Sequence, residues 1–245
     1  MIEIKNLWKS FNSNQVLKSL YLTINDGESL VIIGKSGSGK SVLLKLIIGL
    51  LKPEMGEIWI EDENIVGMGF REVQKIRRRF GFVFQAAALF DSLTVADNVG
   101  LALRKIFDWS EDKARSRIRE CLAFVDLQGM ENKYPAELSG GMKKRVGIAR
   151  AIATYPRYIL FDEPTTGLDP ETAENINQLI VKLKKEMEVT SVVVTHDMHS
   201  AFTVGDRIAL LYDGKIEVEG KPAEIRRMNH PEIQKFLIGY LLNKK

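Results

Sequence analysis

Residues 34–41 read GKSGSGKS, and their types and spacing match a phosphate-binding loop. They fit the pattern G-x-x-x-x-G-K-[ST] at every constrained position and follow an apolar run at 29–33. Phosphate oxygens need many N–H donors at close range, which glycine permits because it lacks a Cβ and tolerates unusual backbone angles. A flexible loop that merely contains three glycines is the alternative. The complete motif favours a nucleoside triphosphate site made by Gly34, Lys35, Ser36, Gly37, Ser38, Gly39, Lys40 and Ser41.

Two residues at the end of this loop have specific predicted roles. Lys40 places a positive charge between the β and γ phosphates, and Ser41 offers a hydroxyl ligand to Mg²⁺. The next residues, 42–48, read as a helix whose positive N-terminal end faces the phosphates, and Gly49 reads as its stop. The loop alone does not identify a reaction.

A pair of carboxylates follows an apolar segment more than a hundred residues downstream. Residues 158–164 read YILFDEP, typical of a Walker B strand that ends in Asp162 and Glu163. Asp162 is predicted to hold magnesium, and Glu163 is predicted to polarise the water that attacks the γ-phosphate. A solvated loop is the alternative interpretation of an isolated Asp-Glu pair.

Four further motifs accompany these two. LSGGM at 138–142 precedes a helix-like segment at 143–153, and TGLD at 166–169 follows the carboxylate pair. Gln85 follows the strand-like run 81–84, and His196 follows the run 191–195. Ser139 is a suitable N-cap residue, so the start of its helix would present free N–H groups to an anion.

The order of these motifs resembles that of the ABC ATPases over roughly residues 1–220. The resemblance implies an α/β fold: a P-loop NTPase with a RecA-like core and parallel sheet, an antiparallel β subdomain and an inserted helical subdomain. It also implies ATP hydrolysis with ATP and Mg²⁺ as cofactors. Two copies would sandwich two ATP molecules head to tail, so that Ser139, Gly140 and Gly141 of one copy bind the γ-phosphate held by the other.

The resemblance also implies roles for single residues. Gln85 would sense the γ-phosphate and magnesium, His196 would orient the attacking water, and Asp169 would hold the dimer interface. Phe11 occupies the place of an aromatic that stacks on adenine, and Trp8 is a nearby rival.

Other segments look like those of Mla/Mce-type (MlaF-like) phospholipid transport ATPases. They are LSGGM followed by KKR, FQAAALFDSLTV at 84–95, and QKFLIG at 234–239. This similarity implies an MlaE-like permease, an MCE-domain protein and a small STAS-domain regulator as partners, and phospholipid movement between the bacterial inner and outer membranes. The chain would act peripherally at the cytoplasmic face of the inner membrane. Met142 departs from the usual glutamine of the signature and cannot replace its hydrogen bonds.

Three alternative functions remain open. The chain would energise transport of a polar solute such as an amino acid, act as a soluble ABC ATPase on nucleic acid or ribosomes, or be a small P-loop kinase. Soluble ABC ATPases usually carry long insertions or two ATPase domains, which this sequence lacks. A kinase would have no use for LSGG or His196.

Composition indicates a globular chain of 245 residues, 45% hydrophobic and 27% charged. The net charge of +3 is too small to indicate nucleic-acid binding. We expect the basic clusters at 75–79 and 143–145 to be solvated helix faces, with anionic lipid or an acidic partner as the alternative. The single cysteine, Cys121, is expected in the core. We see neither an N-terminal signal nor an apolar stretch near the ~20 residues that span a bilayer.

The pattern along the chain predicts the organisation. Strand-like alternation dominates to about residue 85, helical patterns dominate 86–156, and a helix-length segment at 171–187 joins two β-rich runs as a βαβ unit. We expect one ATPase domain at 1–220, with the helical subdomain at about 86–156 inserted in it. A helical tail at 221–245 would pack on its own domain, with a partner contact as the alternative.

Overall fold

The computed structural model describes residues 1–242, with side chains described to residue 240. Within this part the strands are β1 (Ile2–Phe11), β2 (Asn14–Ile24), β3 (Ser29–Ile33), β4 (Met55–Ile60), β5 (Glu63–Asn64), β6 (Phe80–Val83), β7 (Tyr158–Asp162), β8 (Thr190–Thr195), β9 (Arg207–Tyr212) and β10 (Lys215–Gly220). The α-helices are α1 (Lys40–Ile47), α2 (Phe70–Arg77), α3 (Val95–Lys105), α4 (Glu111–Phe124), α5 (Gly140–Ile152), α6 (Pro170–Met187), α7 (Met198–Val204), α8 (Pro222–Arg227) and α9 (Pro231–Leu242).

A six-stranded sheet forms the centre of the molecule, in the order β10-β9-β3-β8-β7-β6. All neighbours are parallel except β10, which pairs antiparallel with β9. Every residue of β3, β7 and β8 is buried, as expected for parallel strands covered on both faces. The predicted α/β fold with a parallel core sheet is therefore confirmed.

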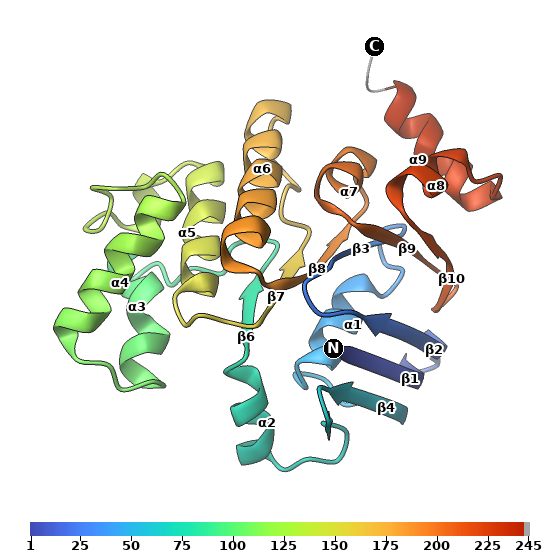
Figure 1. Cartoon of the computed structure of the whole chain (residues 1–245), viewed down its shortest axis with the longest axis horizontal. Helices are drawn as coiled ribbons and strands as arrows, with labels where there is room; N and C mark the ends of the chain where they lie inside the picture. Colours follow the sequence, from blue (N-terminus) through green and yellow to red (C-terminus); the bar gives the residue numbers. More distant parts are fainter. Residues whose placement is uncertain (243–245) are drawn as a thin grey trace.

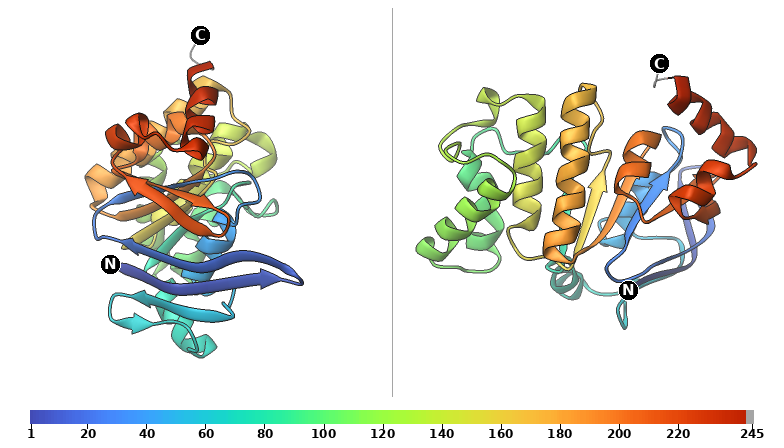
Figure 2. Two further views of the ribbon diagram at one scale, coloured as in Figure 1. Left: turned by 90° about the vertical axis from the view of Figure 1, so that its right-hand side faces the viewer. Right: turned by 45° about the horizontal axis from the view of Figure 1, so that its top comes forward.

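A second sheet, wholly antiparallel, has the order β2-β1-β4-β5. It lies beside α1 and the core sheet, as two of the views show (Figures 1 and 2). Its apolar side chains share one core cluster with α1 and with one face of β3, β7 and β8. The predicted antiparallel part next to the nucleotide loop is present.

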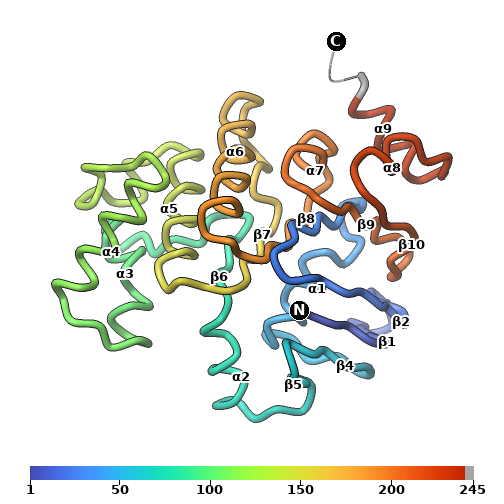
Figure 3. Tube along the Cα trace, in the orientation of Figure 1, coloured from blue at the N-terminus to red at the C-terminus, as the bar shows by residue number. Residues whose placement is uncertain are grey.

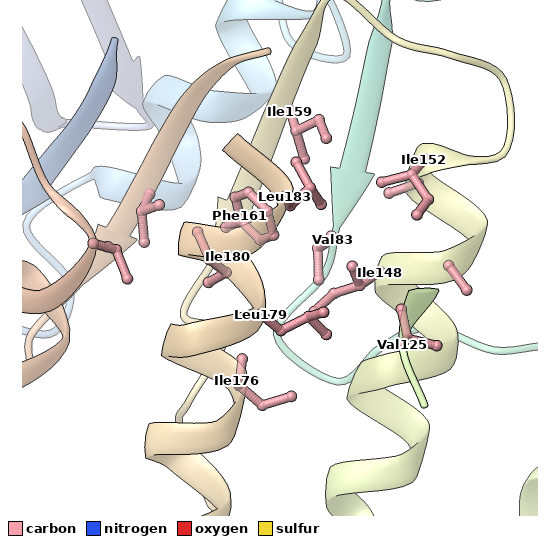
Figure 4. Close-up of a cluster of buried hydrophobic side chains, with 14 of the residues drawn as sticks. Val83, Val125, Ile148, Ile152, Ile159, Phe161, Ile176, Leu179, Ile180 and Leu183 are labelled. Carbon is pink, nitrogen blue, oxygen red and sulfur yellow. The ribbon is translucent and has the colours of Figure 1, made fainter. Parts of the chain in front are cut away.

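Helices α3, α4 and α5 form a group at one end of the molecule, between β6 and β7 in the chain (Figure 1). The second core cluster joins this group to the sheet, with α5 packed against both β6 and α6. Figure 4 shows Ile148 of α5 and Leu179 of α6 pointing toward Val83 and Phe161 of the sheet. Cys121 of α4 is buried in the same cluster, as expected.

The end of the described chain runs from β10 through α8 into α9 (Figure 3). Ile233 and Leu237 of α9 are buried in the second core cluster. The last three residues of the predicted tail lie outside the described residues. Across the part described here, no helix is both long and apolar enough to cross a membrane.

Candidate nucleotide site

The candidate site lies where parallel strands end along one edge of the core sheet. Ile33 pairs with Thr195, Asp162 pairs with Val194, and Val83 pairs with Phe161. The loops that follow β3, β6, β7 and β8 therefore start at similar heights and converge, which is where α/β sheets bind ligands. Together with parts of β1, β2, α1 and α9, these loops enclose a cavity of about 640 Å³ lined by Phe11, Val16, Lys35, Ser36, Gly37, Gly39, Lys40, Ser41, Val42, Gln85, Glu163, Thr166, His196 and Phe236.

The loop between β3 and α1 has a backbone that needs its glycines. Gly37 and Gly39 have φ of 79° and 99°, a region unfavourable for residues with a Cβ. A Cβ on Gly34 would lie 2.6 Å from Ser38 Oγ and 2.7 Å from the carbonyl oxygen of Leu211. Ser38 Oγ is itself buried without a hydrogen-bond partner among the described residues. The missing Cβ of Gly34 leaves room for this buried hydroxyl, and Ser38 is not among the residues that line the cavity.

Lys40 begins α1 and projects its ammonium back into this loop. Nζ donates to the carbonyl oxygens of Gly34 at 2.8 Å and Lys35 at 3.1 Å, and it lies 3.4 Å from Glu163 Oε1. The side chain is only 5% exposed. No acidic residue stands in the first turn of α1, so the positive helix end and the Lys40 ammonium make this part of the cavity attractive to an anion.

Oxygen ligands for a divalent cation meet beside Lys40. Ser41 Oγ donates to Asp162 Oδ1 at 2.6 Å, which joins the start of α1 to the end of β7. Gln85, after β6, also lines the cavity. A hydroxyl, a carboxylate and an amide oxygen are hard ligands of the kind that Mg²⁺ prefers, so these residues fit that ion.

Glu163 and His196 form a hydrogen-bonded pair next to Lys40. His196 Nδ1 lies 2.9 Å from Glu163 Oε2, which also accepts a hydrogen bond from Thr166 Oγ1 at 2.9 Å. Glu163 has φ of 49°, unusual for a residue with a side chain, and its backbone N–H donates to the carbonyl oxygen of Val194. The carboxylate is therefore held in one orientation while its backbone is strained, as often occurs at functional sites.

Lys144 of α5 is buried, so the prediction that the cluster at 143–145 is a solvated helix face is wrong for this residue. Its side chain is 6% exposed, and Nζ donates to the carbonyl oxygens of Gln85 at 2.5 Å and Glu163 at 3.2 Å. Burial lowers the pKa of the Lys144 ammonium, an effect that the nearby carboxylates of Glu163 and Asp162 oppose. Lys144 thus joins the backbones of two predicted site residues.

The predicted signature residues lie outside this cavity. Ser139 caps α5 by accepting a hydrogen bond from the Met142 N–H at 3.3 Å, and both Ser139 and Gly140 are exposed. Gly141 is buried, and a Cβ there would lie 2.5 Å from Thr172 Cγ2. The start of α5 therefore packs closely against the start of α6.

Asp169 lies at this same contact. It caps α6 by accepting a hydrogen bond from the Thr172 N–H at 2.9 Å. Hydrogen bonding by the Thr172 side chain, and then by its backbone N–H, lowers the pKa of the Asp169 carboxyl. The chain does not bring Asp169 or the signature residues into its own nucleotide cavity.

The two aromatic candidates for adenine stacking lie differently. Phe11, at the end of β1, is 44% exposed and lines the cavity, with Lys9 Nζ 5.1 Å from its ring centre. Trp8 Nε1 instead donates to Asn6 Oδ1, and Trp8 is not among the lining residues. Position alone therefore favours Phe11.

Sequence reasoning assigned no role to Val16, Thr166 or Phe236, although all three line the cavity. Thr166 was detectable, since a hydroxyl three residues after a carboxylate can reach it across a turn. Val16 comes from β2, where no motif marks it. Phe236 comes from α9 and lies in the segment 234–239, which indicated a resemblance to Mla/Mce-type ATPases but no part in the nucleotide site.

The family model of the ABC transporter family matches residues 17–166. The probable ribonucleotide transport ATP-binding protein mkl of Mycobacterium bovis is 40% identical over 238 residues, 97% of this chain and 66% of that protein. The methionine import ATP-binding protein MetN 2 of Pseudomonas entomophila is 39% identical over 242 residues, 97% of this chain and 72% of that protein.

Two further comparisons extend these similarities. The chloroplastic protein trigalactosyldiacylglycerol 3 of Arabidopsis thaliana is 39% identical over 258 residues, 98% of this chain and 74% of that protein. Among solved structures, a dimeric ATP-binding cassette in a post-hydrolysis state with bound ADP and Pi has a TM-score of 0.83 at 42% identity. That match covers 91% of this chain and 99% of the cassette.

Proposed function

The chain belongs to the ABC transporter family as an ATP-binding and ATP-hydrolysing subunit, and from this premise we propose that it energises phospholipid transport between the bacterial inner and outer membranes. The observation that supports the ATPase chemistry best is the convergence of Lys40, Glu163 and His196 on one glycine-cradled cavity. We treat residues 1–220 as the ATPase domain, 86–156 as its helical insert and 221–245 as a tail.

Each side chain has a proposed task in hydrolysis. Lys40 and the N–H groups of residues 34–41 bind the phosphates, and Phe11 stacks on adenine. Ser41, Asp162 and Gln85 hold Mg²⁺, which neutralises phosphate charge. Glu163 accepts a proton from the attacking water, and His196 orients that water against the γ-phosphate.

Two copies of the chain complete two sites in this proposal. Ser139 and Gly140 are exposed at the N-terminal end of a thirteen-residue helix, outside their own cavity. Such an end supplies N–H groups and a positive dipole to an anion on another molecule. The similarity to a dimeric cassette supports this arrangement, in which Asp169 and Gly141 lie near the contact.

A mixing experiment tests the shared site. Lys40→Ala removes the phosphate charge, and Ser139→Arg places a bulky cation where the partner's γ-phosphate would lie. Each variant alone should lack ATPase activity. If sites are shared, mixing them should restore part of the activity, because one site of each mixed dimer keeps both wild-type parts. Activity in the Ser139→Arg variant alone, or no recovery on mixing, would contradict the arrangement.

Phospholipid is proposed as cargo from the sequence segments that resemble Mla/Mce-type ATPases. The similarity to a protein whose name is that of a galactolipid supports a lipid cargo. Under this proposal the partners are an MlaE-like permease, an MCE-domain protein and a small STAS-domain regulator. The chain then acts at the cytoplasmic face of the inner membrane, and 85–95 contributes to the surface that receives the permease.

Transport of a polar solute is the second candidate. Relatives named for methionine import and for ribonucleotide transport are 39% and 40% identical to the chain, about the same as the 39% of the relative named for a galactolipid. An ATPase subunit need not touch the cargo, so the cavity described above does not separate the two candidates.

Affinity purification from detergent-solubilised membranes of the native host separates them. Mass spectrometry should identify an MlaE-like permease, an MCE-domain protein and bound phospholipid with the tagged chain. Recovery of a different permease together with a solute-binding protein would show that the cargo is a polar solute and not phospholipid. A Glu163→Gln chain serves as a matched bait, because it should retain nucleotide and partners without turnover.

A further inference from the structure

An aromatic residue from the end of the chain lines the nucleotide cavity. Phe236 of α9 lines the same cavity as residues of the phosphate loop, and its side chain is half-buried. The motifs that define the site end at His196, so α9 lies outside them. Its position at the cavity therefore needs its own explanation.

Helix α9 makes contacts on two of its faces, one with the core and α7 and the other with the nucleotide cavity. Ile233 and Leu237 are 0% and 8% exposed in the core cluster, and the Tyr240 ring contacts Phe202 of α7 at 5.4 Å between ring centres. We call these three residues of α9 its α7 face. Glu232 and Phe236, four residues apart and therefore adjacent on the helix surface, form its cavity face.

An ion pair holds the cavity face on the phosphate loop. Glu232 Oε2 lies 3.0 Å from Lys35 Nζ, and the Glu232 side chain is 10% exposed. Lys235 also pairs with Glu232 from the next turn. The ammonium groups of Lys235 and Lys35 lower the pKa of the Glu232 carboxyl. The carboxylate is thus a charged anchor beside a loop whose N–H groups serve an anion.

We propose that α9 forms a wall of the nucleotide site, in which Phe236 contacts the bound nucleotide and Glu232 positions α9 through Lys35. The ring fills space that water would otherwise occupy and offers a π-face and apolar edge to the ligand. The α7 face keeps the helix in place, and α7 follows directly on His196. The proposal rests on this cavity being the ATP site.

Titration calorimetry on the full-length chain tests the contact with Phe236→Ala. Two ligands that it cannot hydrolyse are compared, ADP and inorganic pyrophosphate. We expect ADP affinity to fall roughly tenfold, the scale of one aromatic contact to a nucleotide. Ile238→Ala is the matched control, because Ile238 lies on the same helix and is 56% exposed. Phe236→Leu keeps an apolar side chain and should lose less affinity.

Each outcome decides between stated alternatives. A loss for ADP alone places the ring beside the adenosine, and a loss for both ligands places it beside the phosphates. Unchanged affinity for both, in a chain whose wild type binds ADP, overturns the proposal. If the wild-type chain binds neither ADP nor pyrophosphate, this result would instead exclude the cavity as the ATP site.

The positioning role of Glu232 has a separate test. Glu232→Gln should weaken ADP binding about threefold, as loss of one partly exposed ion pair would, and should speed amide hydrogen exchange in residues 231–240. Combined with Phe236→Ala, it should add nothing further. Additive losses in affinity, or unchanged exchange, would show that Glu232 does not act through Phe236.

Discussion

His196 Nδ1 and Glu163 Oε2 lie 2.9 Å apart, although the two residues follow different strands, β8 and β7. Because these strands are neighbours in register, the two side chains leave the sheet edge together. The Glu163 carboxylate also lies 3.4 Å from Lys40 and accepts the Thr166 hydroxyl. The Glu163 carboxylate thus contacts an imidazole, an ammonium group and a hydroxyl, which together fix its direction.

Glu163→Gln tests the carboxylate as the base. The amide keeps the shape and a hydrogen bond to Thr166 but cannot accept a proton. Turnover should fall by about 10²–10⁴, the usual contribution of a general base, while ATP affinity stays near wild type. Steady-state phosphate release and nucleotide titration measure the two quantities. Near wild-type turnover would exclude Glu163 as the base.

His196→Ala tests the orientation of water and carboxylate. Loss of one oriented partner in an active site costs about 10²–10³ in kcat. If His196 acts with Glu163 as a unit, adding His196→Ala to Glu163→Gln should lower kcat little further. His199→Ala, which removes an exposed imidazole bonded to Glu174, is the matched control. Equal effects of the two histidine variants would contradict the assignment.

Lys144→Met should affect both activity and stability. The change leaves two backbone carbonyls, those of Gln85 and Glu163, without their shared donor. We expect a loss of about 1–3 kcal/mol in free energy of unfolding, with a lower kcat, because the two loops lose their link. Urea denaturation and ATPase assays measure these effects. Lys143→Met is the control on the same helix, and an equal effect there would count against the link.

Cys121 should be inert in the folded chain. Burial raises the pKa of its thiol to about 12, so the reactive thiolate is scarce near neutral pH. Iodoacetamide should label Cys121 slowly in buffer and rapidly in concentrated urea. The unfolded thiol ionises first, at about pH 8.5, so stability should fall as pH rises from there toward about 12. A Cys121→Ala chain should lack this contribution, and rapid native labelling would contradict the burial.

The phosphate loop and the carboxylate pair were predictable because each depends on neighbours in the sequence. Gly34, Gly37 and Gly39 are needed by the local backbone, and Asp162 closes an apolar strand. The resemblance of the motif order to the ABC ATPases implied the α/β fold, and the local pattern indicated a βαβ unit within it. The contact of Glu232 with Lys35 was not predictable, because it depends on how α9 packs against a distant helix.

Lys144 shows a different kind of failure. A run of three basic residues usually marks a solvated face, and this expectation was wrong for its middle member. The spacing contained the correction: Lys144 lies three residues after Gly141 and four before Ile148, and all three are buried. A charge on the apolar stripe of a helix indicates a buried partner, which the backbone carbonyls of Gln85 and Glu163 supply.

Gly141→Ala tests whether close packing of α5 on α6 sets the position of the signature. The new Cβ would lie 2.5 Å from Thr172 Cγ2, so either the start of α5 or the Thr172 side chain must shift, and we expect α5 to move. A displacement near 1 Å in an active site costs about a hundredfold in rate, and we expect a loss of ATPase activity between about tenfold and that value. Thr172→Ser removes the obstructing methyl group while the Thr172 N–H still caps Asp169. The double variant should therefore recover activity, and Thr172→Ser alone should resemble wild type. A double variant as impaired as Gly141→Ala would mean that the glycine is required for a reason other than this contact, such as access of the partner's γ-phosphate to its N–H.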